Sequence, residues 1–232
     1  MNATSGKSTV VMVHGAWADG TSWKQVIGPL QSRGVATVAA PIPLTSLTDD
    51  VQALDRALER TSGPLILAAH AYAGAVIGST RNDRVRGLVF VSALAPDEGE
   101  TVAEVFYREP PHPQAPQLAP DQHGFIWMPD TGFASAFAQD ASAEENALFA
   151  TVQRPVHVAC IQEKAPRPLW KSVPSWYLVA KQDRMIHPKT QEFMASRMKA
   201  DIQRMDVDHT PIFTAPDKVV GLILAALTAT SR

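Results

Sequence analysis

The sequence predicts an α/β domain built on a mostly parallel β-sheet of about six strands, with helices on both faces. Two observations lead to this prediction. Short continuous apolar runs alternate along the chain with longer amphipathic segments, which is the pattern of βαβ units. Because the runs are continuous, they suit strands that are buried on both faces of a sheet. A chain of 232 residues is long enough for one such domain with an insertion.

The N-terminal part of the chain supplies four predicted strands, at 9–13, 35–40, 65–69 and 85–93. Three predicted helices separate these strands, at 22–33, 49–60 and 73–79. In the first of these helices, Val26, Ile27 and Leu30 recur at helical spacing, and Gly34 is a suitable C-cap. The third helix consists of small apolar residues, which allow a helix to pack closely against a sheet.

The alternation of strands and helices stops at residues 96–170. This segment holds most of the prolines and a helical patch at 144–152, so we expect a cap inserted over the sheet. The alternation then resumes with predicted strands at 175–180 and 202–207 and predicted helices at 190–199 and 218–227. The sequence therefore predicts one domain over residues 1–232, with the cap at 96–170 within it.

Composition and charge exclude several classes of partner. The chain has 21 Lys and Arg against 23 Asp and Glu, a balance that offers no basic surface for nucleic acid or an anionic membrane. It has no apolar run near the roughly 18 residues that span a bilayer, and its polar first residues do not resemble a signal peptide. The single cysteine, Cys160, excludes an internal disulfide. We expect a cytoplasmic protein with a small-molecule ligand, and the oligomeric state is not predicted.

The third predicted strand leads directly into a helix through the sequence Ala69-His70-Ala71-Tyr72-Ala73-Gly74. A tight turn between a strand and a helix, with small residues on either side of its centre, is the setting of a Gly-x-Ser-x-Gly nucleophile elbow. Alanine replaces both glycines, at 69 and 73, and also the central serine, at 71. Ala71 therefore occupies the nucleophile position without having a nucleophilic atom.

The chain resembles the α/β-hydrolase superfamily, in particular the compact branch of small bacterial esterases, plant methyl-ester esterases and hydroxynitrile lyases. The resemblance rests on five features in this order: the segment 13–17, the elbow around Ala71, the segment 87–96, Asp183 and His209. It implies an α/β-hydrolase fold and a catalytic order of nucleophile, acid and histidine along the chain. Asp183 would be the orienting acid and His209 the base. Asp206 and Asp208 flank the histidine and are alternative acids.

The resemblance also implies an oxyanion hole made by the backbone amides of Ala16 and Tyr72. Backbone donors do not depend on side-chain identity, so this part of the site does not require the serine. The candidate substrate-binding residues are His14, Trp17, His70 and Trp127, for which a packing role is the alternative. The sequence has no metal-ligand spacing, phosphate loop or dinucleotide fingerprint, so we expect no metal and no cofactor.

Ala71 allows three interpretations. In the first, alanine was introduced into an esterase, now inactive, whose substrate is a small, mostly apolar ester or acyl compound. In the second interpretation Ala71 is natural, and His209 with Asp183 acts as a general base in a lyase or a cofactor-free oxygenase. In the third, Ala71 is also natural and the protein is a non-enzymatic ligand-binding protein. The alanines at 69 and 73 point to relaxed constraints on the motif, although only small size is required there. The sequence does not decide between an engineered and a natural alanine.

Overall fold

The computed structural model describes residues 8–231, and its main feature is a six-stranded sheet in which every neighbouring pair of strands is parallel. The spatial order is β2-β1-β3-β4-β7-β8. These strands are β1 (Thr9–Val13), β2 (Ala36–Ala40), β3 (Leu65–His70), β4 (Val85–Val91), β7 (Ser175–Ala180) and β8 (Asp201–Met205). The predicted parallel sheet of about six strands is confirmed.

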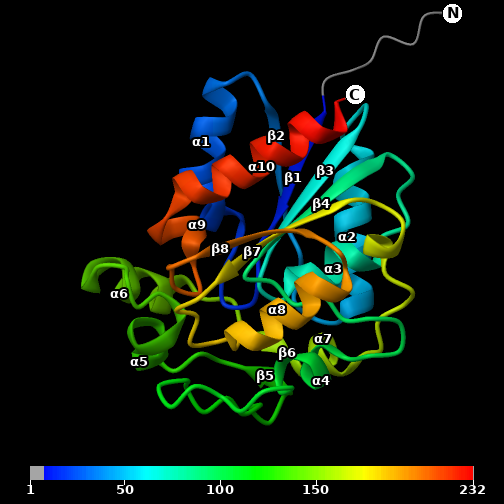
Figure 1. Ribbon diagram of the computed structural model, residues 1–232. Coiled ribbons are helices and arrows are strands. Elements are labelled where there is room, and N and C mark those ends of the chain that lie inside the picture. The colour runs from blue at the N-terminus through cyan, green and yellow to red at the C-terminus, as the bar shows by residue number, and fades with distance from the viewer. Residues whose placement is uncertain (1–7, 232) are drawn as a thin grey trace, which may run out of the picture.

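Helices cover both faces of the sheet (Figure 1). On one face lie α1 (Lys24–Ser32) and α10 (Pro216–Thr230), and on the other lie α2 (Leu47–Glu59), α3 (Ala73–Ser79) and α8 (Pro188–Arg197). The strands serve both layers because successive side chains point to opposite faces. Along β1, Val10 and Met12 pack with the first pair of helices, whereas Val11 and Val13 pack with the other layer.

The ends of the helices follow local signals in the sequence. Helix α2 begins two residues before the prediction because Ser46 caps it, accepting a hydrogen bond from the Asp49 amide at 2.9 Å. Helix α10 begins at Pro216, a residue well suited to a first helical turn because its missing amide proton would have no partner there. In α2 the apolar residues Leu54 and Leu58 are buried.

The chain between β4 and β7 contains the predicted cap, and most of it lies beyond the C-terminal ends of the strands (Figure 1). It includes a short antiparallel pair of strands, β5 (Phe125–Ile126) and β6 (Val156–His157). Its helical pieces are α4 (Val102–Phe106), α5 (Asp130–Gly132), η2 (Phe133–Phe137), α6 (Ala143–Val152), α7 (Val158–Gln162) and η3 (Leu169–Lys171). Of the helices in residues 8–231, none is long and apolar enough to cross a membrane.

Candidate active site

The turn between β3 and α3 holds Ala71 in a conformation that alanine rarely adopts. Its φ angle is +51°, in the left-handed region, which costs on the order of 1–3 kcal/mol for a residue other than glycine. The surrounding backbone maintains the turn, because the Ala71 carbonyl accepts hydrogen bonds from the amides of Leu94 at 2.9 Å and Gly74 at 3.2 Å. This is the strained strand-to-helix turn that a nucleophile elbow requires.

Two glycines allow the backbone to close around this turn. A β-carbon at Gly74 would collide with the Leu94 carbonyl oxygen and would lie 3.0 Å from the Ala93 β-carbon. A β-carbon at Gly15 would lie 3.0 Å from the Ala71 β-carbon. The loop after β1 and the loop after β4 therefore both approach the elbow as closely as backbone atoms can.

His209 and Asp183 meet at the C-terminal ends of β8 and β7. The Nδ1 atom of His209 lies 2.8 Å from Oδ2 of Asp183, and both side chains are buried. The Asp183 carboxylate also accepts hydrogen bonds from the amides of Met185 (2.7 Å) and Ile186 (2.8 Å) and from the Gln191 side chain (2.7 Å). With Nδ1–H donated to the carboxylate, Nε2 of His209 is the atom that can accept a proton.

The two neighbouring aspartates make other contacts. Asp206 is exposed and forms an ion pair with Lys181 at 2.7 Å. Asp208 is buried and accepts hydrogen bonds from Thr214 Oγ1 at 2.6 Å and from the amides of Thr210 at 3.1 Å and Asp140 at 3.2 Å. Burial raises the pKa of the Asp208 carboxyl. The geometry therefore pairs His209 with Asp183, and not with either neighbouring aspartate.

The amides of Ala16 and Tyr72 lie beside the elbow. Both residues line the same pocket as Ala71 and His209. Within residues 8–231, neither of these two amides donates a hydrogen bond to another protein group. The next amide, that of Trp17, is already bound to the Arg154 carbonyl at 2.9 Å. The arrangement thus leaves two unpaired backbone donors next to the nucleophile position, as an oxyanion hole requires.

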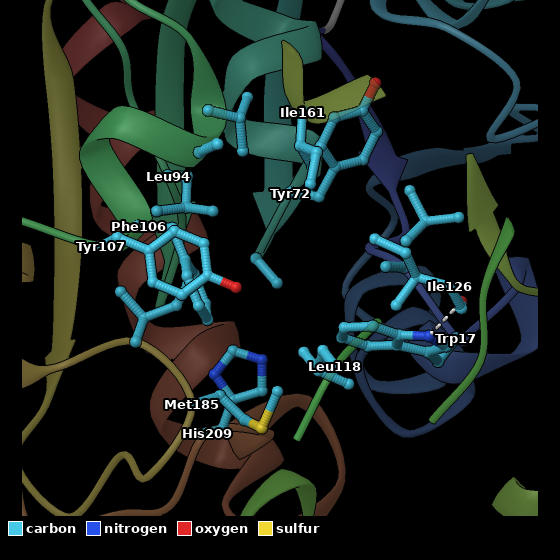
Figure 2. Close-up of a pocket in the computed structure, with 16 residues that line it drawn as sticks. Trp17, Tyr72, Leu94, Phe106, Tyr107, Leu118, Ile126, Ile161, Met185 and His209 are labelled. Carbon is cyan, nitrogen blue, oxygen red and sulfur yellow. Dashed lines mark hydrogen bonds between the residues drawn. The ribbon is translucent and has the colours of Figure 1, made fainter. Parts of the chain in front are cut away.

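The pocket above the elbow is lined mainly by apolar side chains. Figure 2 shows Leu94, Phe106 and Tyr107 on one side and Trp17, Leu118 and Ile126 on the other, with Tyr72, Ile161, Met185 and His209 closing the space between them. Among the described residues that line the pocket, none is a Lys, Arg, Asp or Glu. The cap supplies one wall through α4 and another through β5. The pocket suits an uncharged ligand, because an ion would lose its hydration without gaining a partner.

A family model described as "Alpha/beta hydrolase family" matches residues 10–222. The chain belongs to this family. Two fungal proteins are similar over nearly their whole length. "Probable hydrolase R7" of Phoma sp. is 23% identical, over 94% of this chain and 97% of its own. "Alpha/beta hydrolase nvfD" of Aspergillus novofumigatus is 25% identical, over 94% and 95%.

Solved structures of other proteins share the fold at low sequence identity. Polyneuridine aldehyde esterase superposes with a TM-score of 0.83 at 18% identity, over 95% of this chain and 99% of its own. A pyrethroid hydrolase from Sphingobium faniae gives 0.79 at 18% identity, over 96% and 98%. The methylesterase MES16 from Arabidopsis gives 0.78 at 16% identity, over 95% and 99%. At these identities the likeness shows the α/β-hydrolase fold.

Two polar side chains of this α/β-hydrolase pocket are bound to other protein groups. The Trp17 indole donates to the Ile126 carbonyl at 3.0 Å. The Tyr72 hydroxyl donates to Asp50 Oδ2 at 2.7 Å and points away from the centre of the pocket (Figure 2). The Tyr107 hydroxyl, by contrast, points into the pocket and has no hydrogen-bond partner among the described residues (Figure 2). His209 and Tyr107 are therefore the side chains that present polar atoms to a ligand.

The attachment of Tyr72 to Asp50 gives this tyrosine a defined structural role. Asp50 is fully buried and also accepts hydrogen bonds from the Leu44 amide at 2.7 Å and the Cys160 thiol at 3.5 Å. Burial is the main cause that raises the pKa of the Asp50 carboxyl, the Tyr72 hydroxyl and the Cys160 thiol. The cluster fixes the Tyr72 ring as a wall of the pocket, directly beside the elbow.

Of the four candidate substrate-binding residues, the structure brings only Trp17 to the pocket. Trp127 is 51% exposed and its indole donates to Asp121 at 3.3 Å, so the structure places it outside this pocket and its role in substrate binding stays a prediction. The reason is strand alternation, because the preceding residue, Ile126, takes the inward position.

His14 and His70 are fully buried behind the pocket and do not line it, so the pocket lends no support to the expectation that they bind substrate. The Nδ1 atom of His14 lies 3.0 Å from the Gly15 carbonyl oxygen, and its Nε2 accepts a hydrogen bond from the Ile42 amide at 3.4 Å. Burial lowers the pKa of His14 to about 4, which keeps the ring neutral. Across residues 8–231, no three His, Cys, Asp or Glu side chains are grouped to hold a metal ion.

Proposed function

We propose that this α/β-hydrolase has an esterase-type site for a small, uncharged and mostly apolar ester or acyl compound, with Ala71 at the position of the nucleophile. The main support is the hydrogen-bonded pair of His209 and Asp183, at 2.8 Å, in a pocket that also exposes Ala71. The left-handed φ angle of Ala71 adds to this support, because the turn retains the strain of an elbow without the serine.

The chemistry follows from the placement of these groups. With a serine at position 71, His209 Nε2 takes the hydroxyl proton while the serine oxygen attacks the ester carbonyl. The amides of Ala16 and Tyr72 then stabilise the negative oxygen of the tetrahedral intermediate. The protonated histidine returns the proton to the departing alcohol, and a water molecule, activated by the same histidine, releases the acid. With Ala71 in place, the first of these steps lacks its nucleophile, so the site binds the ester without forming an acyl-enzyme.

The pocket and the similar proteins support this substrate class. The apolar walls favour an apolar body, and the two amides and the Tyr107 hydroxyl provide donors for its oxygen atoms. Three of the structural neighbours are named for action on esters or related compounds: an aldehyde esterase, a pyrethroid hydrolase and a methylesterase. The proposal holds equally for a natural alanine and for one that was introduced.

The test is to restore the hydroxyl. Ala71→Ser should hydrolyse 4-nitrophenyl butanoate at least about 10³-fold faster than the chain as it stands, since removing such a nucleophile costs about 10⁶-fold in a protease. The matched control is Ala71→Ser combined with His209→Ala, which should abolish the gain. A correctly folded Ala71→Ser protein with no gain in hydrolysis would contradict the proposal.

A second candidate function is general-base catalysis without a covalent intermediate. The observation in its favour is that the His209–Asp183 pair and the two unpaired amides are complete although Ala71 has no hydroxyl. His209 would remove a proton from a carbon next to a carbonyl group, and the amides would stabilise the resulting enolate. The test is the exchange of deuterium from deuterated water into the carbon next to the carbonyl group of a bound ketone. Under this function, His209→Gln abolishes the exchange and Ala71→Ser does not accelerate it.

A further inference from the structure

His70 connects the elbow directly to the backbone of His209. It is the last residue of β3 and immediately precedes Ala71. Its Nε2 atom lies 2.8 Å from the carbonyl oxygen of His209, and the two imidazole rings are 4.8 Å apart between centroids. The side chain is completely buried. One hydrogen bond thus joins the residue before the nucleophile position to the base itself.

The partners of His70 determine where its proton lies. A carbonyl oxygen only accepts hydrogen bonds, so Nε2 must bear the proton that is donated to His209. Burial, together with the nearby His209, lowers the pKa of His70 to about 3, and the ring is therefore neutral. Its Nδ1 atom is consequently an unprotonated acceptor. It has no partner among the described residues and lies on the side of Gly15, where a β-carbon would be 3.5 Å away.

The sheet alone does not place His209 next to the elbow. In the order β2-β1-β3-β4-β7-β8, two strands separate β3, which leads to Ala71, from β8, which leads to His209. The loop after β8 must therefore return across the ends of β7 and β4, where no strand pairing sets its position. The Gln182 amide holds the Val207 carbonyl at 3.1 Å, and side-chain hydrogen bonds hold the residues that follow. Among the described residues, the bond from His70 is the one that comes from the elbow strand.

The other attachments of this loop lead elsewhere. The His209 ring is held by Asp183, in the loop after β7. Asp208 accepts from the Asp140 amide, and the Thr210 hydroxyl donates to the Phe137 carbonyl, so both flanking residues are tied to the cap. Only the contact with His70 relates the histidine to residue 71 without involving the cap or the loop after β7, among the hydrogen bonds of the described residues.

We propose that His70 is a positioning residue, which fixes the backbone of His209 relative to position 71 so that His209 Nε2 faces the reacting group. This role rests on the proposed function in one respect, that His209 is the base. It is the same for acyl transfer and for general-base catalysis. It also accounts for a buried nitrogen without a partner, which costs on the order of 1–3 kcal/mol and which an apolar side chain would avoid.

The experiment compares His70→Gln, whose amide nitrogen can still donate to the His209 carbonyl, with His70→Met, which has no donor. The readout is the downfield proton resonance of His209 Nδ1–H, which reports its bond to Asp183 and is assigned by its loss in His209→Gln. We expect the resonance to persist in His70→Gln and to shift or broaden in His70→Met. Val220→Ala, which removes buried volume in α10, controls for lost stability.

A kinetic comparison gives a second readout. In the Ala71→Ser background, His70→Met should lower kcat about 10- to 100-fold with little change in KM, and His70→Gln should restore most of the rate. If Ala71→Ser is inactive but the resonance still distinguishes Gln from Met, the proposed function fails and the positioning role stands. If His70→Met is folded and leaves the resonance unchanged, the positioning role is overturned.

The unsubstituted protein offers a test that does not depend on any variant folding. The nitrogen chemical shifts of the His70 ring distinguish its tautomers. The inference requires a neutral ring with the proton on Nε2 from pH 5 to 8. A proton on Nδ1, or a ring that titrates within this range, would overturn it.

Discussion

The Nδ1 atom of His209 and Oδ2 of Asp183 lie 2.8 Å apart, and less than a twentieth of either side chain is exposed. Asp183 follows β7 and His209 follows β8, so two neighbouring parallel strands bring the pair together. The carboxylate is held by three further donors and the histidine by its backbone, so the pair has one defined geometry.

Asp183→Asn should reduce the esterase activity of Ala71→Ser by about 10⁴-fold. The neutral amide can donate to His209 Nδ1 and so favours the tautomer in which Nε2 holds the proton and is not available as a base. Asp206→Asn is the matched control, because Asp206 is exposed and contacts Lys181, not the histidine. The measurement is kcat/KM for Ala71→Ser alone, with Asp183→Asn and with Asp206→Asn. An equal effect of both substitutions would contradict the assignment of Asp183.

Tyr107→Phe should lower kcat/KM of Ala71→Ser by about 2- to 10-fold, the value of one hydrogen bond to substrate. The Tyr107 hydroxyl points into the pocket and has no partner among residues 8–231, so its loss should leave thermal stability almost unchanged. Trp127→Phe is a matched control, since Trp127 is similarly exposed but lies outside the pocket. Equal kinetics for Tyr107→Phe and its parent would mean that the hydroxyl does not contact the substrate.

Gly74→Ala should destabilise the protein by about 3 kcal/mol or more, because its β-carbon would collide with the Leu94 carbonyl. Gly221→Ala is the control for glycine replacement in a helix. Gly221 is exposed in α10 with no atom within 4 Å of a β-carbon, so its replacement should stabilise by about 0.5–1 kcal/mol. Urea denaturation measures both. An unchanged free energy of unfolding for Gly74→Ala would contradict this and would show that the backbone at the elbow can move to admit a β-carbon.

The free energy of unfolding should decrease as the pH falls from 6.5 towards 4. The pKa of His14 is lowered to about 4 and that of His70 to about 3, so the unfolded chain takes up protons in this range before the folded protein does. Asp50 and Asp208 act in the opposite direction, because their raised pKa values make the folded state bind protons first. His70→Gln removes one of the two histidines and leaves both aspartates. Between pH 7 and pH 5, the free energy of unfolding of His70→Gln should therefore decrease by about 1–2 kcal/mol less than that of the unsubstituted protein.

The fold and the pairing of His209 with Asp183 were predictable to different degrees. Apolar periodicity located β1 and β7 to the residue, because strands buried on both faces consist of continuous apolar runs. The pairing of His209 with Asp183 needed the family resemblance, since Asp206 and Asp208 are closer in sequence. Only the structure shows that these two carboxylates contact other groups.

Other parts of the site had no signal in the sequence. Gln191 contacts Asp183 from a neighbouring helix, and Asp50 contacts Tyr72 across 22 residues of chain. His70 reaches the His209 carbonyl across 139 residues. Local patterns do not encode such contacts, because they depend on how distant loops return over the sheet. The position of Trp127 outside the pocket was not predictable, because the short strand β5 gave no alternation long enough to show which residue faces inward.

Covalent labelling at position 71 tests directly whether the site activates a serine there. Ala71→Ser is treated with a fluorophosphonate, which reacts with activated serines, and the adduct is located by mass spectrometry of peptides. We expect one adduct on residue 71, formed rapidly in Ala71→Ser and lost when His209→Ala is added. A folded Ala71→Ser protein that is not labelled, or that is labelled equally fast without His209, would contradict it.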